Sequence, residues 1–278
     1  MLYLSRILLG IYLILTSSLV QAAEILTLGI HPYKSSTKLI NAYTPLAEYL
    51  SSELGVEVKI QIAPDYDTHV KRIGKDEVDI AYMGPASYVA MVDQYGKKPI
   101  IARQFVNGIP TFQGKIISRR DSKFNMLSDL NGARFAFGDQ RSTMSHLVPR
   151  YMLIEGKVKL DSFKFLGSHD NVALGVLSGD YDAGAVKEAV FYKYRKKGLK
   201  TIATTPALSE HLFVSSSTMN KDLYQAICQA FYKIDKVPQG KFIMTSIKKG
   251  ISSFGPASDQ DYDNLRIILD ELKRNGLW

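Results

Sequence analysis

The sequence predicts an α/β protein of two lobes, each a mostly parallel sheet flanked by helices, with two hinge crossings of the chain. Three observations predict this fold class. Short apolar segments alternate with segments of helical periodicity, which is typical of strand–helix–strand crossover units. The alternation pauses at a loop containing Gly108, Pro110 and Gly114, and a returning strand follows Pro206. The length of 278 residues, with 46% apolar and 22% charged residues, is enough for large cores and excludes a disordered chain.

The first part of the chain predicts alternating strands and helices. Thr44 fits an N-cap, Pro45 fits the first helical position, and Gly55 ends that helix. Strict apolar–polar alternation predicts the strand that follows. The expected elements are strand 25–30, helix 45–54, strand 56–62, a short helix around 70–73, strand 78–83 and helix 87–95.

The alternation resumes after Gly114 and ends in a helical C-terminal part. The expected elements are strands 115–118, 134–137, 163–166, 181–186, 200–203 and 211–215, and helices 127–132, 143–155, 169–178, 188–197, 221–234, 240–248 and 260–275. We expect lobe 1 to comprise residues 23–112 and 210–278, and lobe 2 residues 113–209. A cleft beside two such crossings is a natural ligand site.

Residues 1–22 are predicted to be a cleavable secretory signal peptide. Arg6 gives a short basic region, residues 8–15 are apolar, and Val20-Gln21-Ala22 fits a small-x-small cleavage site. The alternative is a membrane anchor, which needs about 20 apolar residues, whereas this run is shorter. We therefore expect export to the periplasm. The single cysteine, Cys228, lies in an apolar helical pattern and is interpreted as a buried thiol.

The formal net charge of +8 is compatible with an anionic partner but does not identify one. The basic run 193–197 ends a predicted helix, where cations complement the helix dipole, so we expect no nucleic-acid partner. The sequence has no GxSxG, HExxH, CxxC, Walker A or GxGxxG motif. Its five histidines lack metal-ligand spacing. We expect no catalytic residue, no metal and no cofactor.

The most informative segment is residues 138–149, which follows a strand and opens a helix. Ser142, Thr143 and Ser145 fall at the start of that helix, where free backbone N–H groups and the dipole favour an anion. Arg141 adds a guanidinium that could bind an oxyanion. An ordinary Ser/Thr N-cap explains the same pattern, and the residues alone leave both interpretations open.

Several segments together resemble one protein family over about residues 26–232. They are Tyr43–Leu50, Pro64–Tyr66, Val78–Pro85, Leu127–Gly132, Gly138–Pro149, Gly167–His169 and Gly179–Val186. In order and spacing they are similar to the phosphate/phosphite/phosphonate-binding periplasmic proteins of ABC transporters. This resemblance implies a type II periplasmic-binding fold.

The resemblance also implies a site in which a helix start holds a tetrahedral oxyanion. Carried over to this sequence, the contacts are Ser142, Thr143, Tyr66 from the first lobe and His169 from the second. Tyr66 could instead be a packing residue, and His169 could cap the helix that it begins.

The sequence departs from the family pattern at several of these positions. Met144 stands where the third hydroxyl of the helix start is expected, followed by Ser145 and His146, and Phe112 replaces a tyrosine. Met144 could line the site or point into the core. In relatives that bind aminoalkylphosphonates, acidic side chains hold the amino group. Those positions are Ala189 and His211 here, with Glu188 adjacent, so we expect no aminoalkylphosphonate ligand.

The sequence as a whole predicts a periplasmic solute-binding protein, acting as a monomer, that closes over a small phosphate- or phosphonate-like oxyanion. It would deliver this ligand to an ABC-transporter permease in the inner membrane. The alternative is a sensory protein of the same fold that acts on a membrane sensor kinase or receptor. A periplasmic enzyme is a third class, but it would need a nucleophile or metal site that the sequence does not offer.

Overall fold

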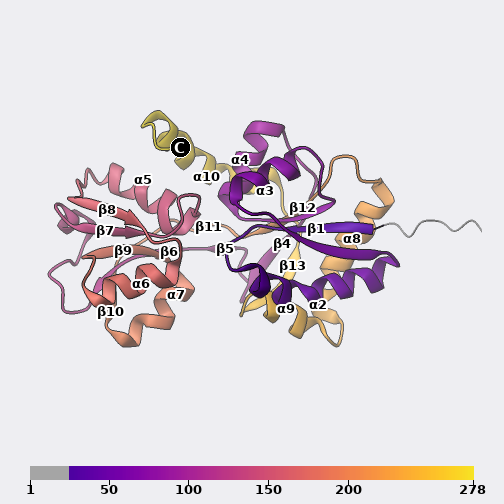
Figure 1. Cartoon of the computed structure of the whole chain (residues 1–278), viewed down its shortest axis with the longest axis horizontal. Coiled ribbons are helices and arrows are strands. Elements are labelled where there is room, and N and C mark those ends of the chain that lie inside the picture. The colour runs from indigo at the N-terminus through magenta and orange to yellow at the C-terminus, as the bar shows by residue number, and fades with distance from the viewer. Residues whose placement is uncertain (1–24) are drawn as a thin grey trace, which may run out of the picture.

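The computed structural model describes residues 25–278 as two lobes, each built on its own β-sheet (Figure 1). This α/β architecture confirms the predicted fold class. Residues 1–24, which include the predicted signal peptide, lie outside the described part of the chain. Among residues 25–278 no helix has the length and apolar character needed to cross a membrane.

The first lobe has a six-stranded sheet in the order β13-β4-β12-β3-β1-β2. Its strands are β1 (Ile25–Ile30), β2 (Glu57–Ile62), β3 (Ile80–Met83), β4 (Ile100–Val106), β12 (Leu212–Ser215) and β13 (Ile251–Gly255). Its helices are α2 (Ser36–Leu54), α3 (Tyr66–Gly74), α4 (Pro85–Tyr95), α8 (Lys221–Lys233), α9 (Gly240–Ile247) and α10 (Asp263–Arg274).

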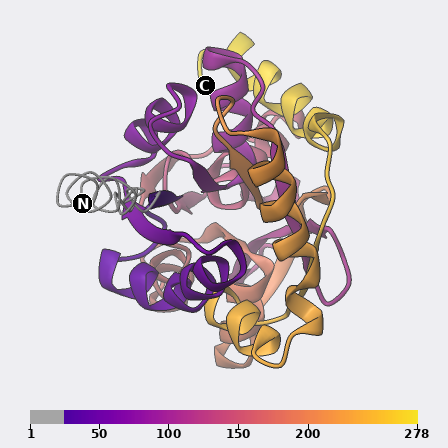
Figure 2. The same cartoon turned by 90° about the vertical axis from the view of Figure 1, so that its right-hand side faces the viewer.

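Helices cover both faces of this sheet, so it has a core on each side. Helices α2, α8 and α9 lie on one face, and α3, α4 and α10 on the other (Figures 1 and 2). Strand β3 contributes side chains to both cores, because successive side chains point to opposite faces of the sheet. Ile80 and Tyr82 pack in the core under α2, α8 and α9, and Ala81 and Met83 pack in the core under α3, α4 and α10. This burial on both faces explains why β3 is apolar throughout.

The second lobe has a five-stranded sheet in the order β10-β6-β9-β7-β8. Its strands are β6 (Gly114–Arg119), β7 (Arg134–Phe137), β8 (Ser162–Phe165), β9 (Ala183–Lys187) and β10 (Leu199–Thr204), and its helices are α5 (Val148–Glu155), α6 (His169–Ser178) and α7 (Glu188–Tyr194). Two short strands, β5 (Thr111–Phe112) and β11 (Leu208–Ser209), pair antiparallel with each other where the chain passes between the lobes.

Both sheets are mixed, so the prediction of mostly parallel sheets is wrong. Strand β12 runs antiparallel to β3 and β4, and β6 runs antiparallel to β9 and β10. These are the strands by which the chain enters each lobe from the other. Leu212 at the start of β12 lies beside Met83 at the end of β3, and Gly114 lies beside Lys187. A strand that enters a sheet at the edge where its parallel strands end must run in the opposite direction.

Two local expectations also change. Helix α2 begins at Ser36 rather than after Thr44, so Pro45 lies inside it. Leu39 and Tyr43 are buried and extend the apolar stripe of the helix toward its N-terminus. Burial of each such side chain stabilises the fold by about 1.5–3 kcal/mol, which together offsets the cost of about 3 kcal/mol for a proline inside a helix. The predicted end at Gly55, with φ 69°, is confirmed. Strands β4 and β13, which pair with each other, are absent from the sequence prediction.

The lobes share a core around the C-terminal helix. Met144, Leu147 and Val148 of the second lobe belong to the same buried cluster as Leu265 and Leu269 of α10. Helix α10 thus contacts both α4 and α5 (Figure 1). The predicted lobe limits at 112/113 and 209/210 stay a prediction.

Candidate functional site

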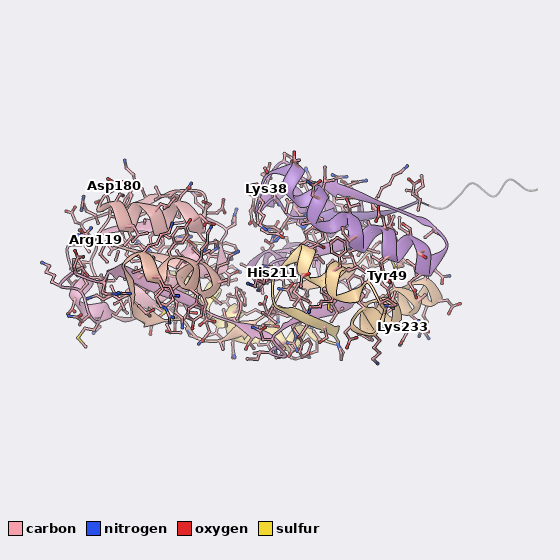
Figure 3. The ribbon with its side chains drawn as sticks, turned by 90° about the horizontal axis from the view of Figure 1, so that it is seen from below. Lys38, Tyr49, Arg119, Asp180, His211 and Lys233 are labelled. Carbon is pink, nitrogen blue, oxygen red and sulfur yellow. The ribbon has the colours of Figure 1, made fainter. Side chains whose placement is uncertain are left out.

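Polar loops from both lobes meet where the parallel strands end. His31 directly follows β1, Gly84 directly follows β3, and Lys187 ends β9. His211 lies at the edge of the first lobe that faces the second (Figure 3). In open α/β sheets, ligands bind outside the carboxyl ends of the strands. The fold therefore brings the candidate site to the lobe interface.

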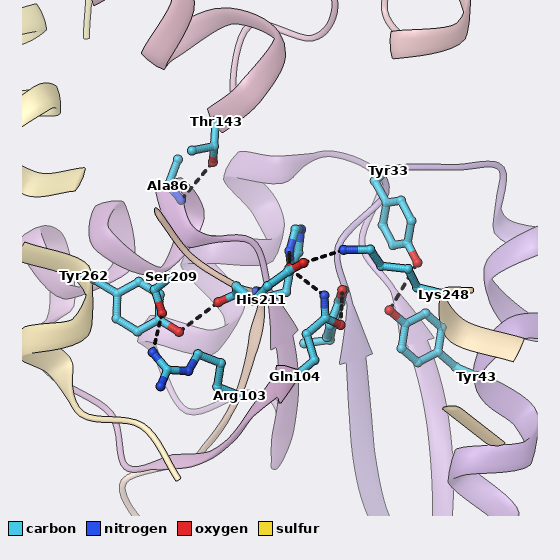
Figure 4. A network of polar contacts seen from close by, with 12 residues as sticks. Tyr33, Tyr43, Ala86, Arg103, Gln104, Thr143, Ser209, His211, Lys248 and Tyr262 are labelled. Carbon is cyan, nitrogen blue, oxygen red and sulfur yellow. Dashed lines mark hydrogen bonds and ion pairs between the residues drawn. The ribbon is translucent and has the colours of Figure 1, made fainter. Parts of the chain in front are cut away.

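The predicted helix start lies at this interface. A π-helical turn, Thr143–Leu147, continues directly into α5. The Ser142 hydroxyl accepts a hydrogen bond from the Ser145 N–H at 3.2 Å, so Ser142 is an N-cap. The Thr143 hydroxyl accepts from the Ala86 N–H of α4 at 3.3 Å, across the lobe interface (Figure 4). The N–H groups of Thr143 and Met144 are first-turn donors without an intrahelical acceptor, and the dipole there favours an anion.

The next two side chains hold this helix start in place. Met144 is 1% exposed, packs in the shared core and accepts a hydrogen bond at its sulfur from the Thr205 hydroxyl at 3.4 Å. Of the two alternatives for Met144, the structure shows the core position. Ser145 is fully buried, and its hydroxyl donates to the Ala185 carbonyl at 2.6 Å. The polar groups that remain for a ligand come from the backbone and from Ser142 and Thr143.

His169 begins α6 without capping it. The cap is Ser168, whose hydroxyl accepts from the Asn171 N–H at 3.2 Å. The His169 Nδ1 accepts the Lys187 N–H at 3.0 Å, so the neutral ring carries its proton on Nε2. Burial and the nearby Lys187 charge lower the pKa of His169 to about 3. At neutral pH His169 is therefore an uncharged ring with an Nε2–H donor.

The two predicted aromatic residues lie on the first lobe. Tyr66 is the first residue of α3, and its ring meets the edge of the His31 ring at 5.3 Å between centroids. Burial and the charge of Asp139 raise the pKa of Tyr66, so its hydroxyl stays protonated. Phe112 of β5 lies 5.4 Å from the His211 ring. Tyr66 thus packs against His31 and Phe112 packs against His211, and these two histidine rings lie 5.8 Å apart between centroids.

Arg141 points to a different part of the interface. Its guanidinium pairs with Asp67 of α3 at 3.0 Å and lies 5.0 Å from the ring centroid of Trp278. These three residues, together with Tyr66, Val70, Ser87, Ala90 and Gln94, line a cavity of about 170 Å³. Arg141 thus links the second lobe to α3 and to the C-terminal residue.

Sequence reasoning did not select His31, which lies among several aromatic rings of the first lobe. The His31 ring lies within 4.9–5.8 Å, between centroids, of the rings of Tyr33, Tyr66, Tyr82 and His211. The available signal was position, because His31 directly follows the first strand and such residues collect at one edge of the sheet.

Glu210, which lies in the return crossing between β11 and β12, is a second residue that the sequence did not single out. Its fully buried carboxylate accepts hydrogen bonds from Gln104 Nε2 at 2.7 Å, His211 Nδ1 at 3.0 Å and Lys248 Nζ at 2.5 Å. Burial alone would raise the pKa of Glu210, but the bond from His211 and the Lys248 charge outweigh it and lower the pKa. Glu210 is therefore an ionised carboxylate whose negative charge is balanced by Lys248.

Histidines that are far apart in sequence come together here, but they do not form a metal site. The His31 and His69 ring centroids are 6.0 Å apart, and His69 Nε2 donates to the Tyr82 carbonyl at 3.0 Å. Among residues 25–278 no group of three histidine, cysteine or acidic side chains is arranged to hold a metal ion.

A protein-family model matches residues 28–262, and its description is ABC transporter, phosphonate, periplasmic substrate-binding protein. Two curated relatives match over most of the chain. The phosphate-import protein PhnD of Mycolicibacterium smegmatis is 28% identical over 89% of this chain and 85% of its own length. The phosphonates-binding periplasmic protein of Escherichia coli is 26% identical over 84% of this chain and 72% of its own.

A solved structure shares the fold. PhnD1 from Prochlorococcus marinus, in complex with methylphosphonate, superposes with a TM-score of 0.79 at 23% sequence identity. The match covers 90% of this chain and 99% of that one. The family resemblance predicted from the sequence motifs is therefore confirmed by both sequence and fold.

Proposed function

The chain belongs to the phosphonate periplasmic substrate-binding proteins of ABC transporters, and on that premise we propose that it binds a phosphonate- or phosphate-like oxyanion between its lobes. Bound ligand would be handed to a membrane permease. The helix start at Ser142 and Thr143 supports this proposal most directly. It presents N–H and hydroxyl donors at the lobe interface, and the neutral Nε2–H of His169 would add a further donor.

The chemistry of these donors suits an oxyanion. N–H and O–H groups bind oxygen without adding charge, and their hydrogen bonds strengthen when water is excluded. The hydroxyls of Ser142 and Thr143, the backbone N–H groups of Thr143 and Met144, and His169 would hold the oxyanion, while Tyr66 and Phe112 would border it from the first lobe. Arg141 would close the interface rather than contact the ligand. This set needs neither metal nor cofactor and performs no chemistry on the ligand.

The cellular setting completes the proposal. Residues 1–22 would direct export to the periplasm and be removed, and the mature chain would act as a monomer. Lobe 1 would comprise residues 23–112 and 210–278 and lobe 2 residues 113–209. The two crossings between them would form the hinge on which the lobes close over the ligand.

Calorimetric titration of the purified protein with phosphate, phosphite, methylphosphonate and sulfate tests the proposed function. We expect saturable binding of at least one phosphorus oxyanion. The double variant Ser142→Ala/Thr143→Ala should lose roughly tenfold or more in affinity, since each lost hydrogen bond to a charged group is worth about 1.5–3 kcal/mol.

Thr245→Ala serves as the control, because that hydroxyl donates to the Lys241 carbonyl within α9, away from the interface. If no oxyanion gives a saturable heat, the proposed function is wrong. If the double variant binds as tightly as the unchanged protein, the helix start has no part in binding.

A further inference from the structure

Lys187 is a partly buried ammonium group for which residues 25–278 supply no acidic partner. The nearby acids are each engaged elsewhere: Glu188 pairs with Lys115 at 3.0 Å, Asp170 pairs with Lys193, and Glu210 pairs with Lys248 at 2.5 Å. Removing an ammonium from water without a counter-charge is costly. The surroundings of Lys187 therefore favour an anion that the chain itself does not provide.

Lys187 lies next to the helix start and to His169. It ends β9, two residues after Ala185, whose carbonyl receives the Ser145 hydroxyl. Its own N–H donates to His169 Nδ1. An oxyanion held at the helix start would thus have Lys187 as a close neighbour on the same lobe.

From the opposite lobe, His31 presents polar atoms that have no partner. Its side chain is 3% exposed, and neither Nδ1 nor Nε2 makes a hydrogen bond among residues 25–278. An unsatisfied buried polar group costs about 1–3 kcal/mol. A ligand that accepts the His31 N–H would remove part of that cost.

Gly84 connects His31 to the helix start. A Cβ added at Gly84 would lie 3.2 Å from the His31 ring and 3.7 Å from His211 Nε2. Two residues later, the Ala86 N–H donates to Thr143. The Lys187 charge also contributes to lowering the pKa of His31, after burial and the charges of His211 and His69. The unpartnered groups of both lobes therefore face one region.

We propose that Lys187 and His31 form a second anion subsite beside the helix start, so that the ligand is a phosphonate or phosphate carrying a further anionic group such as a carboxylate. This inference rests on the proposed function. The neutral donors of the helix start hold the phosphorus oxygens. Lys187 supplies the charge for the second group and His31 supplies an N–H. A ligand whose second group is an ammonium is repelled by Lys187.

Four ligands of graded charge test the subsite by calorimetry. Methylphosphonate has no second group, 2-oxopropylphosphonate has a neutral one, phosphonoacetate an anionic one and 2-aminoethylphosphonate a cationic one. In the unchanged protein we expect phosphonoacetate to bind roughly tenfold or more tightly than 2-oxopropylphosphonate, and 2-aminoethylphosphonate to bind most weakly, because charged hydrogen bonds are the stronger ones.

Two variants remove the subsite groups and keep side-chain volume. Lys187→Met and His31→Phe should each lower affinity for phosphonoacetate by a larger factor than affinity for methylphosphonate or 2-oxopropylphosphonate, and so reduce the preference for the anionic ligand. Lys196→Met, an exposed lysine of the same lobe, controls for net charge and should leave the preference intact. Circular dichroism checks that each variant is folded. If Lys187→Met does not fold, His31→Phe alone still tests the subsite.

The outcomes separate this inference from the proposed function. Equal affinity for the anionic and neutral ligands, or equal losses for all ligands in both variants, overturns the subsite while oxyanion binding stands. Absence of binding by all four ligands, and by phosphate, overturns both proposals.

Discussion

At the residue scale, the Ser142 hydroxyl has a structural use and a proposed binding use. It accepts the Ser145 N–H and so caps the helical segment that follows. The same position begins the set of donors that we propose for the oxyanion. The sequence left these two interpretations open as alternatives, but an N-cap hydroxyl can cap a helix and still donate its own proton to a ligand.

Replacement of Ser142 by aspartate separates these uses. Aspartate is an equally good N-cap, so Ser142→Asp should change the free energy of unfolding by less than about 1 kcal/mol. Its carboxylate lacks a proton to donate and repels an anion, so oxyanion affinity should fall by about a hundredfold or more. Thermal unfolding and calorimetric titration measure the two effects.

Asn220→Asp is the matched control. Asn220 is the N-cap of α8 in lobe 1, where its side-chain oxygen accepts a hydrogen bond from the Asp222 N–H. This variant should leave both stability and affinity nearly unchanged. Unreduced affinity in Ser142→Asp would place the anion away from this helix start.

At the element scale, a buried histidine joins helix α3 to strand β3. His69 is 2% exposed and donates from Nε2 to the Tyr82 carbonyl at 3.0 Å. Burial lowers its pKa to about 4 from the ordinary value of 6.5, although the bond to Tyr82 opposes the shift. Between these two values the unfolded chain binds a proton that the folded chain does not. Stability contributed by neutral His69 is therefore lost as pH falls from 6.5 toward 4.

His69→Gln should reduce this pH dependence. Glutamine keeps an N–H donor for the Tyr82 carbonyl but does not titrate. From pH 7 to pH 5 the unchanged protein should lose about 2 kcal/mol of unfolding free energy through His69, and the variant should lose correspondingly less. Urea unfolding at several pH values measures the difference, and parallel pH profiles would contradict it.

Local sequence patterns predict that a segment is a strand, but they do not predict in which direction the strand runs in its sheet. The alternating residues of β2 predict a strand correctly, because alternation reflects one buried face. The direction of β6 and β12 is not encoded in their apolar residues. It follows from where the chain enters each sheet, which depends on the path of the whole chain.

At the scale of the whole molecule, Arg141 links the lobes beside the site. It pairs with Asp67 of α3 and stacks over Trp278, the last residue of the chain. Because these contacts join different lobes, the proposed opening of the hinge would separate them. A ligand that also bridges the lobes gains affinity from any contact that favours closure.

Arg141→Ala should therefore weaken oxyanion binding without removing a ligand contact. The Arg141 side chain is 43% exposed, so its screened ion pair should be worth less than about 1 kcal/mol, which corresponds to a loss of up to fivefold in affinity. In this variant a higher ligand concentration than in the unchanged protein should be needed to decrease the radius of gyration, which X-ray scattering measures.

Arg120→Ala controls for charge, because the Arg120 guanidinium donates to the Arg195 carbonyl within the second lobe. A loss of a hundredfold or more in Arg141→Ala would instead place Arg141 in contact with the ligand.

The sequence by itself determined the α/β class, most elements, the family and the helix start at Ser142 and Thr143, because these depend on local periodicity, capping residues and short motifs. Only the tertiary structure decided that Met144 packs into the core, that Arg141 pairs with Asp67 and that His31 meets Tyr66 and His211. Those facts depend on residues far apart in the chain being brought to one interface. Burial and hydrogen-bond partners at such an interface are properties of the assembled lobes, and no local pattern records them.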